Sequence, residues 1–223
     1  MLDARKAILF DLDGVIVLTE NVKAEAHVKT IEQLGGQASA SLYIKVLGQS
    51  HEEVRSAFLE AAQVHADLNE YTKIFRKIYH ELLDKKLEVR PGAVALIREL
   101  QKLGFLLAVV SSSSMSSVMK IMKSIGLDDA FRAFVTSDDV KEKKPNPEPY
   151  LLTLKKLNVK PRDAVIFEDS PSGVEAAIRA NVRVVAVRHA FNIEQKFEDA
   201  YTILDDFLNT AEVTDLVQSI LTP

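Results

Sequence analysis

The sequence predicts an α/β protein, with a parallel sheet covered by helices on both faces and an all-helical insertion after the first strand. From residue 90 onward, short apolar runs alternate with amphipathic helical stretches, a pattern typical of such a sheet. Between residues 17 and 87 the apolar positions recur only at helical spacing, which predicts the insertion. We therefore expect an α/β core of residues 1–16 and 88–223 and a helical domain of residues 17–87.

The first strand lies in the run Ala7 to Ile16, whose apolar part ends at Asp11 and Asp13. Side chains two apart on a strand share a face, so both carboxylates are expected in one site. Two carboxylates at the end of a buried strand repel each other, and they persist most easily beside a cation or with one proton bound. For this motif alone, a strand end followed by an Asp-Gly turn is an equally good interpretation.

The insertion is expected to contain helices only. A first helix begins near Thr19 and ends at Gly35-Gly36, a second begins near His51, and a longer third carries apolar residues from Leu68 to Leu82. In none of these stretches do apolar and polar residues alternate as they do in a strand.

The core then alternates helices with strands. Strands are expected at residues 105–110, 133–136, 164–167, 182–187 and, more weakly, 201–204. Helices are expected at 118–125, from Asn146-Pro147, and from Pro171 with Ser170 as its N-cap. An earlier helix has the apolar stripe Val94, Ile97, Leu100 and Leu103.

Polar clusters follow several of these strands, where parallel α/β sheets bind their ligands. They are Ser111, Lys144 before Pro145, and Glu168-Asp169. Each has an ordinary explanation, namely a helix cap, a solvated loop, and favourable charge at a helix start. Their joint presence with the first acid pair favours a catalytic site.

Composition narrows the function. The net charge of -4 and the lack of a dense basic segment argue against nucleic-acid binding. The absence of cysteine excludes disulfides, thiolate metal sites and thiol nucleophiles. The apolar run after Lys6 is too short for a signal peptide or a membrane span, so we expect a cytoplasmic protein without membrane association.

Four motifs resemble those of the haloacid dehalogenase superfamily, in the branch of phosphatases and phosphomutases with a small helical cap. They are FDLDGV at 10–15, VVSSS at 109–113, KKPNPEPY at 143–150 and FEDSPSGVEAA at 167–177. The resemblance implies a Rossmann-like core and a cap formed by the insertion. Asp13 also separates the chain from the dehalogenases, which lack this second aspartate.

The resemblance implies a role for each motif. Asp11 would be the nucleophile and Asp13 the general acid and base. Ser111, with the Ser112 amide, would bind phosphoryl oxygens, and Lys144 would pair with Asp11. Mg²⁺ would be held by Asp11, Asp13 and Asp169, with Glu168 in the shell around it.

The cap would act as a lid that selects the substrate. Its expected tip, which would contact the leaving group, comprises Gly48, Gln49, Ser50 and His51. Relatives often carry an aspartate before the Thr-Glu pair that follows the first motif, whereas this chain has Leu18. Glu20 and Lys23 are therefore either substrate contacts or a solvated first turn of helix.

We thus predict a Mg²⁺-dependent phosphatase that hydrolyses a small phosphorylated metabolite, a sugar or polyol phosphate, through an aspartyl-phosphate. The alternatives are a β-phosphoglucomutase-like enzyme, a phospho-accepting signalling receiver domain and a non-catalytic descendant. A receiver has no helical insertion, and its acceptor aspartate follows a later strand. The only partner expected is the substrate, with the chain a monomer or weak dimer.

Overall fold

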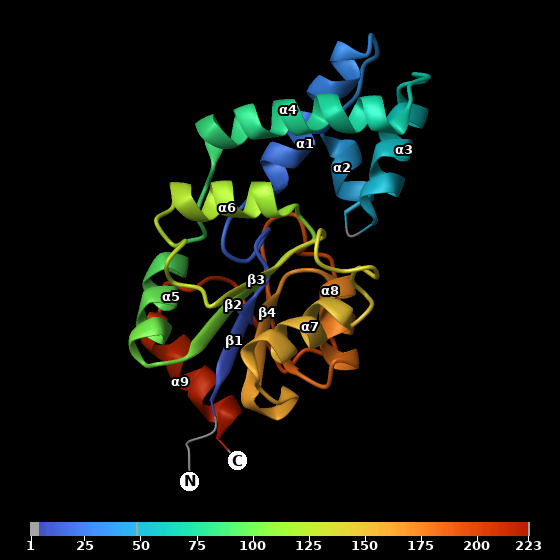
Figure 1. Cartoon of the computed structure of the whole chain (residues 1–223). Coiled ribbons are helices and arrows are strands. Elements are labelled where there is room, and N and C mark those ends of the chain that lie inside the picture. The colour runs from blue at the N-terminus through green and yellow to red at the C-terminus, as the bar shows by residue number, and fades with distance from the viewer. Residues whose placement is uncertain (1–4, 48, 223) are drawn as a thin grey trace. The chain divides into compact units, whose positions relative to one another are not determined.

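The computed structural model describes residues 5–47 and 49–222, which form two compact units (Figure 1). One unit contains residues 1–17 and 89–223, and the other contains residues 18–88. Each border lies one residue beyond the expected one. The chain passes between the units through two neighbouring segments, because Val17 forms an antiparallel bridge with Val89 and Leu18 N donates to Glu88 O at 2.8 Å.

The larger unit is built on a six-stranded parallel sheet in the order β3-β2-β1-β4-β5-β6. The strands are β1 (Ala7–Phe10), β2 (Leu106–Val110), β3 (Ala133–Val135), β4 (Ala164–Glu168), β5 (Arg183–Val187) and β6 (Thr202–Leu204). The predicted α/β fold with a parallel sheet is confirmed. Since β1 lies in the interior of the sheet, hydrogen bonds to β2 and β4 fix both of its edges.

Helices cover both faces of this sheet (Figure 1). On one face lie α5 (Ala93–Lys102) and α9 (Thr210–Leu221), and on the other lie α7 (Glu148–Leu157) and α8 (Pro171–Arg179). Helix α6 (Met115–Ser124) follows β2, and a short 3₁₀ helix, η1 (Pro161–Asp163), precedes β4. Ser170 caps α8 as predicted, because its Oγ accepts from Gly173 N at 3.1 Å.

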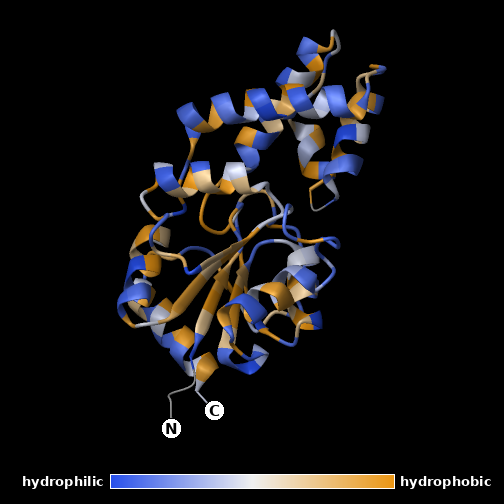
Figure 2. Ribbon diagram, in the orientation of Figure 1, coloured by the Kyte–Doolittle hydropathy of each residue, from blue (hydrophilic) through white to orange (hydrophobic). Residues whose placement is uncertain are grey.

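Side chains of β1 alternate between the two layers of the core. Leu9 packs with apolar residues of α7 and α8 such as Leu154 and Val174. Phe10 stacks on Phe167 of β4, with ring centroids 5.1 Å apart. All four residues of β1 are fully buried, and the strands form the apolar centre of the unit in Figure 2. Packing on both faces therefore holds the carboxyl end of β1 in place.

Among the described residues of the smaller unit, helices are the only regular secondary structure. Its helices are α1 (Glu20–Gln33), α2 (Ser41–Lys45), α3 (His51–Ala61) and α4 (Leu68–Lys86), with α1 packed against α4. The five-residue α2 was not expected. Aromatic rings surround His27, whose Nδ1 lies 2.8 Å from Tyr71 Oη. Because burial lowers the pKa of His27 to about 3, it is a neutral core residue.

Two details of the core differ from expectation. Strand β1 ends at Phe10, so Asp11 and Asp13 lie beyond it and strand alternation does not orient them. Of the expected stripe, Val94 in α5 and Leu103 directly after it are exposed, and the buried side of α5 is formed by Ala93, Leu96, Ile97 and Leu100. A stripe with a constant spacing of three residues drifts by about 60° at each step, which explains why its ends leave the buried face.

Two glycines of the core predict different costs of substitution. Gly92, which precedes α5, has φ +81°, and a Cβ there would lie 2.1 Å from Phe207 O; Gly104 has φ +84° with no atom nearby. Gly104→Ala should cost only the backbone strain, about 1 kcal/mol of unfolding free energy. Gly92→Ala should cost about 3 kcal/mol or more, since the backbone of Phe207 must also move. Urea denaturation of both variants checks this, and equal losses would contradict the steric argument.

Candidate active site

The register of the central strands brings the predicted residues to one edge of the sheet. Phe10 pairs with Val109 of β2 and with Phe167 of β4. Asp11 continues the ladder, because its N–H donates to Phe167 O at 2.9 Å. The residues after β1, β2 and β4 therefore leave the sheet at the same level, as the rule for parallel sheets predicts.

Lys144 joins three of these strand ends. Its Nζ donates to Asp11 Oδ1 at 2.5 Å, to Glu168 Oε1 at 2.6 Å and to Val110 O at 3.0 Å. The three charged side chains are at most one-tenth exposed. The interpretation of Lys144 as a solvated loop residue is therefore wrong, and its predicted pairing with Asp11 is present in the structure.

Both carboxylate oxygens of Glu168 accept hydrogen bonds from other residues. Its Oε1 also accepts from Tyr150 Oη at 2.8 Å. Its Oε2 accepts from Asp169 N, Ser170 N and Ser170 Oγ at 2.9–3.0 Å. A Cβ on Gly173 would lie 1.9 Å from the Glu168 carboxyl group. A carboxylate with this many protein donors is suited to orienting its neighbours rather than to binding a cation directly.

Burial and nearby charges shift the pKa values of Asp11, Glu168 and Lys144. Burial raises the pKa of Asp11 well above its ordinary value, and Glu168, Asp169 and Asp13 raise it further against the opposing charge of Lys144. Burial alone would raise the pKa of Glu168 too, but Lys144 and the hydrogen bonds hold it below its ordinary value. For Lys144, the attraction of both carboxylates outweighs burial and raises its pKa. Of these two carboxylates, Asp11 is therefore the one whose charge is less compensated.

Asp13 is oriented by serines that follow β2. Ser113 Oγ donates to Asp13 Oδ2 at 2.9 Å, and Ser111 Oγ lies at a longer 3.4 Å from the same atom. Ser113 N in turn donates to Ser111 Oγ at 3.0 Å. Ser111 is buried, whereas Ser112 is partly exposed. Ser113 was not predicted, although the run of four serines was the signal that could have indicated it.

Asp169 lies against the loop that carries the first two aspartates. A Cβ on Gly14 would fall 2.1 Å from Asp169 Oδ2, so only glycine allows this approach. Two residues after β5, His189 and Asn192, also contact Asp169. They were not predicted, but the rule that ligands bind at carboxyl ends of strands could have indicated them.

The acidic residues fit a hard divalent cation. Asp11 and Asp169 supply carboxylate oxygens, and the close approach at Gly14 brings Asp169 to the loop that contains Asp13. Across residues 5–47 and 49–222, no three His, Cys, Asp or Glu side chains form a ready metal site. Mg²⁺ needs no such set, because it keeps several waters and takes only one or two carboxylates from the protein.

The predicted cap contacts have other partners in the smaller unit. Gly48 lies outside the described residues. Ser50 and Glu53 form a capping box at the start of α3, with Ser50 N 2.8 Å from Glu53 Oε2. Glu20 is buried and accepts from Tyr43 Oη at 2.7 Å and Lys23 Nζ at 2.9 Å, so a solvated first turn is wrong for Glu20. That Gln49, Ser50 and His51 contact the substrate stays a prediction.

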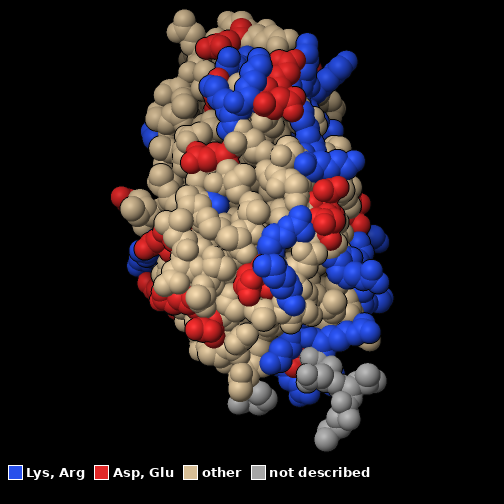
Figure 3. Space-filling view, turned by 90° about the vertical axis from the view of Figure 1, so that its left-hand side faces the viewer, with Lys and Arg blue, Asp and Glu red and all other residues tan. Residues whose placement is uncertain are grey.

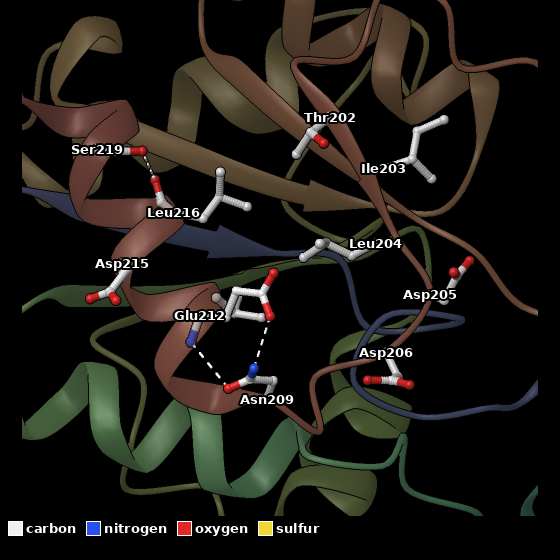
Figure 4. A pocket seen from close by; sticks show the side chains of 11 residues that line it. Thr202, Ile203, Leu204, Asp205, Asp206, Asn209, Glu212, Asp215, Leu216 and Ser219 are labelled. Atoms are coloured by element: carbon white, nitrogen blue, oxygen red, sulfur yellow. Dashed lines mark hydrogen bonds between the residues drawn. The ribbon is translucent and has the colours of Figure 1, made fainter.

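A surface hollow of the larger unit lies apart from this cluster, between β6 and α9 (Figure 4). Carboxylates of Asp205, Asp206, Glu212 and Asp215 line it. This negative charge would repel a phosphate ester. On the face drawn in Figure 3, Lys and Arg side chains lie among Asp and Glu side chains. Within the described residues, no helix is long and apolar enough to cross a membrane.

Comparison with known proteins gives the family. Residues 8–187 match the family described as haloacid dehalogenase-like hydrolase. The phosphorylated carbohydrates phosphatase of Thermotoga maritima is 29% identical, covering 97% of this chain and all of the relative. Hexitol phosphatase A of Escherichia coli is 31% identical, covering 82% of each chain.

A solved structure agrees with these relatives. The protein CbbY of Rhodobacter sphaeroides, in complex with phosphate, superimposes with a TM-score of 0.83 at 29% identity, covering 92% of this chain and 95% of the other. The relatives named as phosphatases confirm the predicted enzyme class, a phosphoric monoester hydrolase. The chain belongs to the haloacid dehalogenase-like hydrolases.

Proposed function

We propose that this protein is a Mg²⁺-dependent phosphatase of small phosphorylated sugars or polyols, with Asp11 as its nucleophile. The observation that carries the proposal is the 2.5 Å contact of Lys144 Nζ with Asp11 at the carboxyl end of β1. Asp13 and the serines after β2 lie beside it. The named substrates of the two relatives, phosphorylated carbohydrates and hexitols, support the substrate class.

The reaction proceeds in two displacements. A carboxylate oxygen of Asp11 attacks phosphorus, and the bond from phosphorus to the substrate oxygen breaks as Asp13 gives that oxygen a proton. Asp13 then takes a proton from water, which attacks the aspartyl-phosphate and regenerates Asp11 with release of inorganic phosphate. Lys144 orients Asp11 and offsets part of the negative charge that gathers during both displacements.

A bound Mg²⁺ would add the positive charge that Lys144 alone does not supply. Its protein ligands would be Asp11, the backbone carbonyl of Asp13, and Asp169. When bound, it would offset the repulsion between the Asp11 carboxylate and the phosphoryl oxygens. The raised pKa of Asp11 supports this assignment, because burial and three acidic neighbours together outweigh the opposing charge of Lys144.

The residues at the start of α6 favour hydrolysis of the substrate over the mutase reaction, in which a phosphoryl group is transferred by way of a sugar bisphosphate. A mutase must hold a second phosphate, which requires cationic side chains or free amides. Here Ser114 Oγ lies within hydrogen-bond distance of Ser116 and Ser117. Met115 N donates to Asp138 Oδ2 at 2.8 Å, so a carboxylate already occupies this helix N-terminus, which would otherwise favour an anion.

Asp11→Asn should abolish turnover, by more than about 10³-fold, because it removes the nucleophile at nearly constant volume. Since the folded state raises the pKa of Asp11, its ionisation lowers stability as pH rises above the ordinary value of 3.8. The variant should therefore melt at a higher temperature than wild type at pH 7 in EDTA. Phosphate release and calorimetry measure the two effects.

The exposed Asp128→Asn is the matched control for this test and should change neither quantity. Activity of Asp11→Asn within tenfold of wild type, in protein purified from a host that lacks the wild-type enzyme, would refute the covalent mechanism.

Removal of divalent cations should abolish phosphate release, and Mg²⁺ should restore it. Ca²⁺ should restore little, because it is larger and less strict in its coordination geometry. The measurement is phosphate release after dialysis against EDTA and titration with each ion. Full activity in excess EDTA would contradict the metal assignment while leaving the nucleophile open.

With β-glucose 1-phosphate and catalytic glucose 1,6-bisphosphate, we expect inorganic phosphate as the main product and little glucose 6-phosphate. The reason is that Asp138 disfavours a second phosphate at the start of α6. A coupled dehydrogenase assay measures glucose 6-phosphate in parallel with phosphate release. Efficient isomerisation would favour the mutase instead.

A further inference from the structure

The loop after β5 contacts Asp169 through two residues, His189 and Asn192. Asn192, only 1% exposed, donates from Nδ2 to Asp169 O at 2.7 Å and to Val187 O at 3.0 Å. Its Oδ1 accepts from His189 N at 2.8 Å. One buried amide thus ties the end of β4 to the end of β5 and fixes the backbone of His189 beside Asp169.

The ring of His189 has a defined tautomer. Phe191 N–H points to His189 Nδ1 at 3.2 Å, and because a backbone N–H can only donate, Nδ1 must be the acceptor. The proton of the neutral ring is therefore on Nε2, which donates to Asp169 Oδ2 at 2.9 Å. Both side chains are nearly buried, at 6% and 12% exposure.

The other side of this carboxylate is bounded by the backbone of Gly14. A Cβ there would lie 2.1 Å from Asp169 Oδ2 and 3.0 Å from His189 Nε2. Oδ2 is therefore confined between Gly14 and the imidazole ring. Arg90 secures the Gly14 segment in turn, because its buried guanidinium donates to Gly14 O and to Asp205 O. With one oxygen fixed, the direction of the other is fixed as well.

We propose that His189 and Asn192 are positioning residues that orient Asp169 for the divalent cation, so that the loop after β5 contributes to metal affinity. The proposal rests on the proposed function, which makes Asp169 a metal ligand. Hydrogen bonds from a second residue to a ligating carboxylate orient it and lower the entropic cost of binding, and their loss commonly weakens metal affinity about 10–100-fold.

The test is Mn²⁺ binding to the full-length enzyme without substrate, followed by electron paramagnetic resonance of the free ion. His189→Met and His189→Gln form a matched pair of similar length, of which only glutamine keeps a donor. His189→Met should bind Mn²⁺ about 10–100-fold more weakly than wild type, and His189→Gln should stay within about threefold of it. A merely structural role would not produce this difference. Melting temperatures in EDTA verify that each variant is folded.

His189→Asn serves as the second variant if the methionine variant does not fold. Its amide is too short to reach Asp169, so it should bind Mn²⁺ as weakly as predicted for methionine. Wild-type affinity in either folded variant that cannot donate to Asp169 overturns the proposal, and so does an equal loss in His189→Gln.

Asp169→Asn separates the two levels of inference. If this variant loses Mn²⁺ binding while His189→Met keeps it, the role of His189 is wrong and the metal site stands. If Asp169→Asn binds Mn²⁺ like wild type, the metal site itself fails, and the role of His189 with it.

Discussion

The larger unit depends on one buried ammonium group between two buried carboxylates. Lys144 contacts Asp11 and Glu168 at 2.5 and 2.6 Å, almost without exposure to water. Burying three charges is costly, and such a cluster persists only when its hydrogen bonds are satisfied. Glu168 meets this condition through Tyr150, Ser170 and the amides at the start of α8. The residues around β4 and α8 therefore hold Glu168 in the orientation in which it accepts from Lys144.

The negative charge of Glu168 is well compensated, whereas that of Asp11, the proposed nucleophile, is not. Glu168 accepts five hydrogen bonds, and its pKa is lowered. Asp11 has one cationic partner and three acidic neighbours, and burial together with these neighbours raises its pKa. A buried carboxylate that is poorly compensated lowers the stability of the fold, but it leaves Asp11 available for a cation and a phosphoryl group. Such a conflict between stability and activity is common at functional sites.

Close backbone approaches complete the site. Gly14 and Gly173 each leave room for a carboxylate, Asp169 in the first case and Glu168 in the second. Because the interior of a protein is densely packed, a single methyl group at either position would displace a charged side chain. The glycines in these sequence motifs are therefore required by the limited space in the site, in addition to the residues that its chemistry requires.

The sequence by itself determined the order of the strands and of the helices other than α2, α9 and η1, and the strand ends at which the acids, Ser111 and Lys144 gather. It could do so because buried strands and amphipathic helices have distinct periods, and because carboxyl ends of parallel strands share one edge. Only the tertiary structure decided the other partners: that Lys144 also joins Glu168, that Ser113 orients Asp13, that Glu20 is buried, and that His189 and Asn192 reach Asp169. These side chains lie in loops or at helix starts, or reach across elements distant in sequence. Their directions follow from how the chain closes around the sheet, which no local periodicity encodes.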